Sequence, residues 1–116
     1  MASFSQGDVI RVPFPYTDKD TRQRRPALVV SLSTVGESNA LLWVVMITSA
    51  ENRTWPGDVA IRHLRKAGLP VPSVIRTAKL ATIEARYAER LGVLDKATLT
   101  DAMRRIRAML FDAVGP

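Results

Sequence analysis

Two neighbouring arginines, Arg24 and Arg25, could act on an anionic substrate. They stand where a polar stretch, residues 17–25, meets an apolar and partly β-branched stretch, residues 27–32. Pro26 restricts its own backbone and favours an extended Arg25, which limits where that guanidinium can point. A guanidinium held in place presents forked donors that match phosphate oxygens. A plain surface arginine is the alternative interpretation, and the Arg-Arg-Pro sequence alone favours it.

A second pair of candidates, Thr48 and Ser49, follows directly after the apolar run of residues 41–47. Hydroxyl groups at the point where a buried strand ends can bind a phosphate or orient a nucleophile, but they also commonly form turns by bonding to nearby backbone. Trp55 lies a few residues further on, in a polar loop, and is followed by Pro56. Its flat face could stack on a nucleic-acid base, or it could cover one end of the hydrophobic core.

The composition excludes several classes of chemistry. The chain has 116 residues, no Cys and one His, and its length suits a single domain, residues 1–116. The lack of Cys excludes disulfides, thiol nucleophiles and Cys-based zinc sites, and one His excludes a histidine pair for acid–base catalysis within the chain. No metal-ligand motif is present, so we expect neither a metal ion nor another cofactor.

The charge is unevenly distributed. The formal net charge is +6; residues 1–59 carry six Lys/Arg against six Asp/Glu, whereas residues 60–116 carry eleven against five. This excess predicts a polyanionic partner, such as nucleic acid, an anionic membrane surface or an acidic protein, and a soluble protein that happens to be basic is the alternative. The start of the chain lacks the features of a secretory signal, and no apolar run approaches the roughly 20 residues that span a bilayer, so we expect a cytoplasmic protein.

The elements that must position these side chains are short strands followed by one helix. Alternating and β-branched patterns predict about five strands, over residues 8–14, 27–32, 41–47, 58–62 and 73–83. A helix follows, with its N-cap at Asp95 or Thr98 and apolar residues at helical spacing: Leu99, Met103, Ile106 and Leu110. This order predicts a mainly β fold with a C-terminal helix, in the form of a small barrel capped by that helix.

Several segments occur in an order and spacing typical of one protein family. They are residues 7–17 (GDVIRVPFPYT), 25–31 (RPALVVS), 47–49 (ITS), 68–69 with 73–74, 79–83 (KLATI) and 92–94, followed by the closing helix. Across nearly its whole length the chain resembles the MazF/PemK family of bacterial toxin endoribonucleases, or mRNA interferases. Residues 13–17 (PFPYT) make it most similar to the PemK-like branch.

The resemblance implies a small SH3-like β-barrel of the MazF/PemK/CcdB toxin type. It also implies the toxin component of a type II toxin–antitoxin system, a homodimer that cleaves single-stranded RNA at short sequence motifs and so inhibits translation and growth. The family's catalytic arginine falls on Arg25, and its catalytic hydroxyl falls on Thr48. Some members have a histidine where this chain has Arg24, so the resemblance carries no catalytic role to that position.

The resemblance further implies cleavage without a metal ion, in which the RNA 2′-hydroxyl attacks the adjacent phosphorus. The products are a 2′,3′-cyclic phosphate and a 5′-hydroxyl. Negative charge builds up on the phosphate oxygens in this step, and one preorganised donor there contributes about 3–4 kcal/mol. We expect Arg25 to stabilise that charge and Thr48 to bond either a phosphate oxygen or the attacking hydroxyl. The sequence does not identify the general base.

Further RNA contacts are expected from basic, hydroxyl and aromatic side chains, namely Arg22, Arg24, Ser49, Trp55, Arg76, Lys79 and Arg86. Two other functions remain open. A related toxin type shares the implied fold and poisons DNA gyrase by binding it, and an inactive member would serve only as an RNA-binding module. The presence of both Arg25 and Thr48 favours the nuclease.

Two protein partners are expected. The resemblance implies an antitoxin encoded beside the toxin, and the basic charge predicts that its inhibitory segment is acidic, partly disordered and able to occupy the RNA groove. The resemblance also implies a homodimer. Apolar surface for it is offered by the strand of residues 73–83 and by the helix face of Leu99, Met103 and Ile106, although both could be plain core.

Overall fold

The computed structural model describes residues 3–13 and 24–111. The six strands are β1 (Asp8–Pro13), β2 (Arg24–Val29), β3 (Leu41–Ser49), β4 (Asp58–Ala60), β5 (Ser73–Glu84) and β6 (Glu89–Val93). The helices are α1 (Leu64–Ala67) and α2 (Lys96–Leu110), with short 3-10 turns η1 (Glu37–Asn39) and η2 (Ala85–Tyr87). None of the helices in the described part of the chain is long and apolar enough to cross a membrane.

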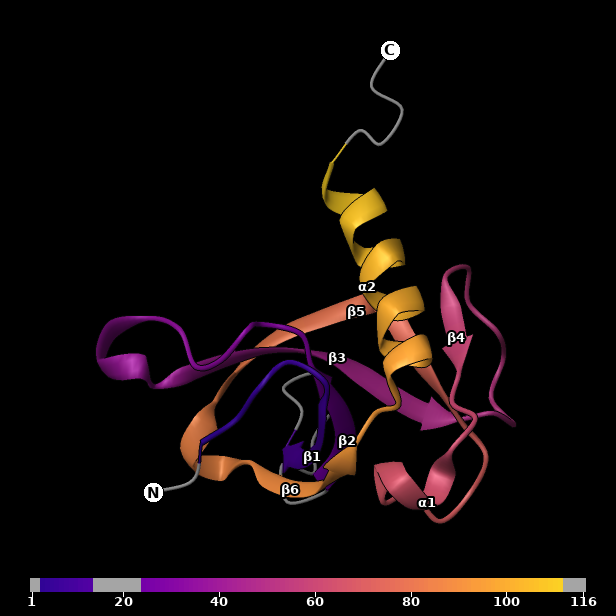
Figure 1. The fold of residues 1–116 in the computed structure, drawn as a ribbon, viewed down its shortest axis with the longest axis horizontal. Helices are drawn as coiled ribbons and strands as arrows, with labels where there is room; N and C mark the ends of the chain where they lie inside the picture. Colours follow the sequence, from indigo (N-terminus) through magenta and orange to yellow (C-terminus); the bar gives the residue numbers. More distant parts are fainter. Residues whose placement is uncertain (1–2, 14–23, 112–116) are drawn as a thin grey trace.

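All six strands form one antiparallel sheet in the order β4-β5-β3-β2-β1-β6. The expected mainly β fold with a C-terminal helix is therefore confirmed. The sheet is not closed into a barrel, because β4 and β6 form its two edges in the ladders described. Figure 1 shows β3 and β5 running side by side across the molecule, with α2 standing against them.

The sequence patterns located five of the strands and missed the sixth. Residues 89–93 (ERLGV) contain two charged residues and a glycine, so they show neither alternation nor a β-branched run. They nevertheless form β6, because β1 supplies the ladder from Asp8 to Arg11 and Arg11 pairs with Glu89. Tertiary pairing overrides weak local propensity here.

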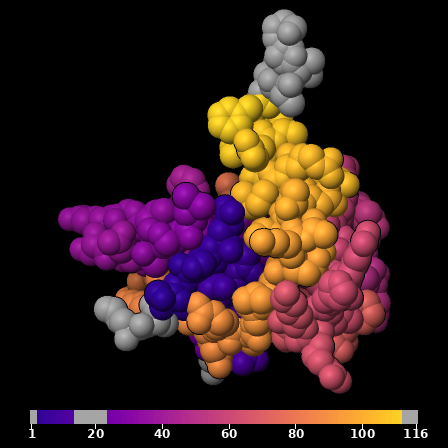
Figure 2. Space-filling model, viewed as in Figure 1, coloured from indigo at the N-terminus to yellow at the C-terminus, as the bar shows by residue number. Residues whose placement is uncertain are grey.

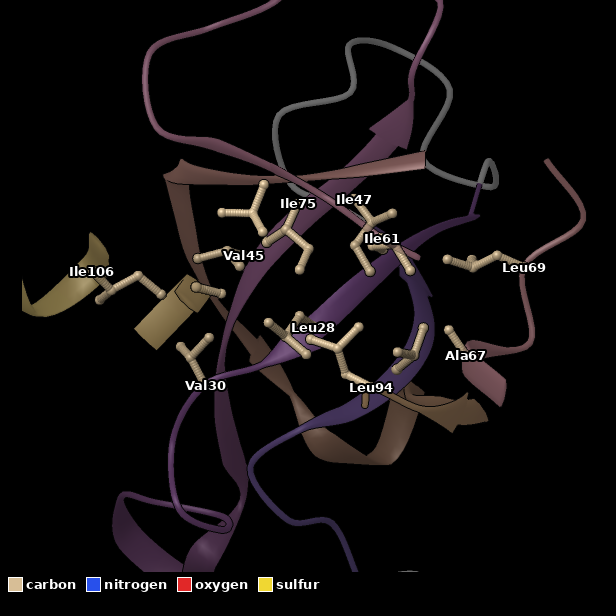
Figure 3. Close-up of a cluster of buried hydrophobic side chains, with 13 residues drawn as sticks. Leu28, Val30, Val45, Ile47, Ile61, Ala67, Leu69, Ile75, Leu94 and Ile106 are labelled. Atoms are coloured by element: carbon tan, nitrogen blue, oxygen red, sulfur yellow. The ribbon is translucent and has the colours of Figure 1, made fainter. Parts of the chain in front are cut away.

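The sheet separates two clusters of buried apolar side chains, since successive residues of a strand point to opposite faces. One cluster joins β2, β3, β5 and α2, and Figure 3 shows Leu28, Val45 and Ile75 converging there with Ile106 reaching in from α2. The other cluster includes Val12, Ala27 and Met46, with η2 packed against it. Ile106 is buried, and Leu99 and Met103 pack against the first cluster, so this helix face is largely core.

A short α1 helix packs tightly against β6. Gly68 ends α1 with a left-handed backbone (φ 76°), and a Cβ there would lie 2.2 Å from the carbonyl oxygen of Leu91. A Cβ on Gly92 would lie 2.3 Å from the carbonyl oxygen of Lys66. Both glycines are needed for this contact, because any side chain would force the two backbones apart. Figure 2 shows α1 filling one lower corner of the molecule, opposite the projecting segment between β2 and β3.

Helix α2 begins at a well-formed N-cap. The Asp95 Oδ2 atom accepts hydrogen bonds from the Thr98 N–H (3.0 Å) and the Thr98 hydroxyl (2.9 Å). Of the two candidate caps, Asp95 is therefore the one used. Partial burial raises the pKa of the Asp95 carboxyl, but the two Thr98 hydrogen bonds and the nearby His63 outweigh it and lower that pKa below its ordinary value of 3.8.

We predict that Asp95→Ala lowers the free energy of unfolding by about 1 kcal/mol at pH 7, the usual cost of a lost N-cap. Because the folded-state pKa is depressed, this stabilisation is complete above the unfolded pKa of about 3.9 and is lost as pH falls through the folded value. Urea unfolding at pH 7 and at lower pH measures it. Asp95→Asn keeps the cap and is the control; an Ala variant as stable as the Asn variant at pH 7 would contradict the assignment.

Candidate active site

The sheet register places Arg25 and Thr48 on the same face of the sheet. Strands β2 and β3 pair Ala27 with Met46, the last pair at this end of their ladder, and Arg25 and Thr48 lie two residues beyond it on their strands. Side chains two residues apart share a face of a strand, so Arg25 and Thr48 lie on the face that carries Ala27 and Met46. Two residues 23 positions apart in the sequence therefore lie on one face of the sheet, beyond the same end of the β2–β3 ladder.

Arg25 is half-buried and has an unsatisfied donor. Its backbone pairs with Val12 of β1, and its Nε atom is buried without a hydrogen-bond partner among the described residues. A buried N–H group without an acceptor destabilises the folded protein. A ligand that brought an acceptor to this Nε would remove that cost. Arg24 differs, because its side chain is exposed and its Nη2 donates to the Tyr87 carbonyl oxygen, with Glu89 nearby.

Thr48 is buried, with 8% of its surface exposed, near the end of β3. Its Oγ1 atom accepts a hydrogen bond of 2.7 Å from the Nδ2 of Asn52, in the segment that follows the strand. Ser49 is half-buried, and its Oγ accepts from the Glu51 N–H at 3.2 Å, which is the contact of a turn-forming hydroxyl. Sequence reasoning did not single out Asn52; its position four residues after Thr48 in a polar segment was the available signal.

Arg76 is buried in an ion pair with Asp58, a residue that sequence reasoning also missed. The Nε of Arg76 lies 3.2 Å from Oδ1 of Asp58, and its Nη2 lies 2.9 Å from Oδ2. The same Nη2 donates to the Arg53 carbonyl oxygen at 2.7 Å, and the guanidinium lies 4.4 Å from the centre of the Trp55 ring. The register places Arg76 beside Met46, hence on the same face as Thr48.

The other predicted RNA contacts are scattered. Lys79 is half-buried, with its Nζ 5.9 Å from the centre of the Trp55 ring, so it lies in the same region as Arg76. Arg86 lies in η2, beyond the end of β5 where Glu84 pairs with Leu41, at the end of β3 away from Thr48. Its side chain is exposed and bonded to Glu84 at 2.9 Å. Arg22 lies outside the described residues.

The described structure therefore places Thr48 and Arg76 near one end of β3, on the face that also carries Arg25. Trp55 is half-buried and lies against the Arg76 guanidinium, and Lys79 lies near the same ring. In the described part of the chain, no group of three or more His, Cys, Asp or Glu side chains is arranged to hold a metal ion. The fold and the site define a small β-sheet protein that presents an arginine and a buried hydroxyl on the same face of its sheet.

Comparison with known proteins shows which family the chain belongs to. Residues 5–110 match the sequence profile of the family described as "PemK-like, MazF-like toxin of type II toxin-antitoxin system". The chain belongs to this toxin family, as the sequence resemblance predicted. A comparison with curated protein sequences finds no match.

Several solved structures share this fold. A MazE–MazF complex from Deinococcus radiodurans superimposes with a TM-score of 0.74 at 23% identity, over 95% of this chain and 97% of that chain. MazF alone from the same organism gives 0.74 at 22% identity, over 95% and 98%. An endoribonuclease from a Mycobacterial species in complex with its cognate antitoxin gives 0.68 at 20% identity, over 92% and 94%.

We predict that Asp58→Ala lowers the free energy of unfolding by about 3–5 kcal/mol, because it leaves the buried Arg76 charge without its partner. The matched control is Glu84→Ala, which removes the exposed partner of Arg86 and should cost less than about 1 kcal/mol. Urea denaturation of both variants measures the difference. Equal, small losses would contradict the assignment of Arg76 and Asp58 as a structural pair.

Proposed function

We propose that this chain is an endoribonuclease that cleaves single-stranded RNA, as the toxin of a type II toxin–antitoxin system. The observation that carries the proposal is the presence of two groups on one face of the sheet, at one end of the β2–β3 ladder. One is the Arg25 guanidinium, with a buried Nε that lacks an acceptor among the described residues, and the other is the buried Thr48 hydroxyl. A phosphodiester oxygen would supply the missing acceptor.

The reaction proposed is an internal transfer at phosphorus. The 2′-oxygen of the RNA forms a bond to the adjacent phosphorus, the bond to the 5′-oxygen breaks, and the 2′-hydroxyl proton is given up while the leaving oxygen gains one. The positively charged guanidinium of Arg25 stabilises the charge that develops on the non-bridging oxygens. Thr48 supplies a hydroxyl next to the same phosphate. The Mycobacterial relatives described as endoribonucleases support this activity for the fold.

We predict that purified protein cleaves a long single-stranded RNA in the presence of EDTA and leaves 2′,3′-cyclic phosphate and 5′-hydroxyl ends. Arg25→Ala should lower the cleavage rate at least about 10²–10³-fold, and Thr48→Val, which removes only the hydroxyl, about 10²-fold. Gel electrophoresis of end-labelled RNA measures both rates.

Matched controls are Arg105→Ala and Thr100→Val on the exposed side of α2, which make the same chemical changes away from the site. Each should cleave like the wild type, with melting temperatures checked for all four variants. A wild type that leaves RNA intact but inhibits DNA gyrase, or that binds RNA without cutting it, would replace the nuclease with one of the two alternatives.

We propose that the chain acts as a homodimer. Its interface would be the part of β3 and β5 that lies beside α2, on the same face of the sheet as that helix. Large apolar side chains are exposed there, including Trp43 (51%) and Leu80 (45%). With Leu32, Met103 and Leu110 they line an open hollow of about 740 Å³. Such a continuous apolar surface is typical of a protein–protein interface. Leu99 and Ile106, which the sequence also offered for this role, are instead part of the core.

We further propose an acidic antitoxin as the second partner. The net charge of +6 favours an acidic segment, and the solved complexes of MazF with MazE and of the Mycobacterial endoribonuclease with its antitoxin support a protein inhibitor. If this segment binds over Arg25 and Thr48, its binding and RNA binding are mutually exclusive.

For this assembly we predict a dimer by light scattering at micromolar concentration, and displacement of RNA by the acidic protein encoded beside this chain. Trp43→Glu should yield a monomer, because it places a charge in the apolar interface. Tyr87→Glu is the matched control, since Tyr87 has a similar exposure (46%) on η2, away from this face. A wild-type monomer would refute the dimer, and an antitoxin that binds together with RNA would refute the shared site.

A further inference from the structure

The hydrogen bond between Asn52 and Thr48 determines which way the Thr48 hydroxyl acts. The Nδ2 of an asparagine is a donor only, so in the 2.7 Å contact the Thr48 Oγ1 is the acceptor. A threonine hydroxyl has one hydrogen and two lone pairs, and this bond uses one lone pair. No hydrogen bond donated by Thr48 is found within residues 3–13 and 24–111, so its hydrogen is left to bond an incoming acceptor.

We propose that Asn52 is a positioning residue that makes Thr48 a hydrogen-bond donor to a phosphate oxygen of the RNA, an inference that rests on the proposed nuclease function. Accepting a hydrogen bond polarises the Thr48 O–H and strengthens it as a donor. The bond leaves Thr48 its hydrogen for an incoming acceptor, so of the two roles that the sequence left open we assign it the bond to a phosphate oxygen.

The segment that carries Asn52 is held in place from several sides. The Asn52 N–H donates to the Ser49 carbonyl oxygen (3.1 Å), and the N–H of Ala50 donates to Pro72 (2.9 Å). On the other side, the Arg76 Nη2 bonds the Arg53 carbonyl oxygen, adjacent to Asn52, at 2.7 Å. Asn52 itself is exposed, so its amide reaches the buried Thr48 from a fixed backbone and not from close packing.

The decisive variant is Asn52→Asp, which keeps the shape of the side chain but removes its donor. The ionised carboxylate that it introduces can only accept, so the Thr48 O–H turns toward it and away from the phosphate. We expect single-turnover cleavage at saturating RNA to fall about 10²-fold at pH 7, as in Thr48→Val. Cleavage should recover as pH falls toward about 4, where the introduced carboxyl is protonated and can donate again. Asn52→Ala, which only frees the hydroxyl, should lose about tenfold.

The negative charge introduced by Asn52→Asp could also slow cleavage by repelling the RNA, again in a pH-dependent way. The same substitutions are therefore also made in the Thr48→Val variant. In Thr48→Val the hydroxyl is absent, and if Asn52 acts through Thr48, adding Asn52→Asp or Asn52→Ala changes the residual rate less than about twofold at any pH. Repulsion between the introduced carboxylate and the RNA would instead persist there. Asn39→Asp, the same change at an exposed residue of η1, is the control for charge and should follow the wild-type pH profile.

The outcomes separate this inference from the function on which it rests. If the wild type cleaves RNA and Asn52→Asp cleaves equally well at pH 7, Thr48 does not depend on a donor at position 52 and the inference is wrong while the nuclease stands. If the loss in Asn52→Asp is the same with and without the Thr48 hydroxyl, Asn52 does not act through Thr48. If the wild type leaves RNA intact, the proposed function itself fails.

Discussion

The buried ion pair between Arg76 and Asp58 is the interaction on which the arrangement of the site depends. Removing both charges from water is costly, and only good geometry with further hydrogen bonds offsets that cost. Here further hydrogen bonds and a ring contact contribute to that offset. The two side chains share two hydrogen bonds, the Arg53 carbonyl accepts a third, and the Trp55 ring lies against the guanidinium. Asp58 also accepts from the Trp55 N–H at 3.0 Å. The pair therefore joins β4, β5 and the segment between β3 and β4 into one unit.

An irregularity in β5 places Arg76 where this pair can form. Met46 of β3 pairs with Arg76, but the preceding Val45 pairs with Leu80, so three residues of β5 have no counterpart on β3. Such a bulge bends a strand and redirects its side chains. Thr77, in the bulge, donates from its hydroxyl to the Gly57 carbonyl oxygen at 2.8 Å and so fastens it to the start of β4. Because of this bend, β5 contributes Arg76 to the ion pair on one side of the bulge and the exposed Leu80 to the apolar surface on the other.

Much of this architecture could be predicted from local patterns, because alternation and helical spacing report burial residue by residue. The strand of residues 41–47 and the helix after Asp95 are examples, and both lie close to their expected bounds. Residue type and position made Arg25 and Thr48 candidates, the family resemblance implied their catalytic roles, and the register then placed them on one face. The buried ion pair of Arg76 could not be predicted from local patterns. Its partner Asp58 is 18 residues away on another strand, and an arginine in an alternating strand is usually a surface cation.

Asn52 escaped prediction for a related reason. A polar residue in a short segment after a strand is usually part of a turn, and the Asn52 N–H does bond to Ser49. Its side-chain contact with Thr48 exists only because the segment curves back over the end of β3, and that curvature is set by bonds from β5 and from Pro72. Local sequence encodes the residue type, whereas distant strands decide what the residue touches.

Arg25 and Arg76 show how the same side chain takes opposite tasks on one face of one sheet. The contacts of Arg76 with Asp58, Arg53 and Trp55 are all internal, so its guanidinium stabilises a particular fold. Arg25 lies on the same face, yet its buried Nε finds no acceptor in the described part of the chain. An unsatisfied buried donor costs about 1–3 kcal/mol, which a chain selected only for stability would remove by substitution or supply with a partner. Retaining that cost beside a buried hydroxyl is consistent with a site that is completed by an anionic ligand, because the ligand then binds to a donor that no internal group must release.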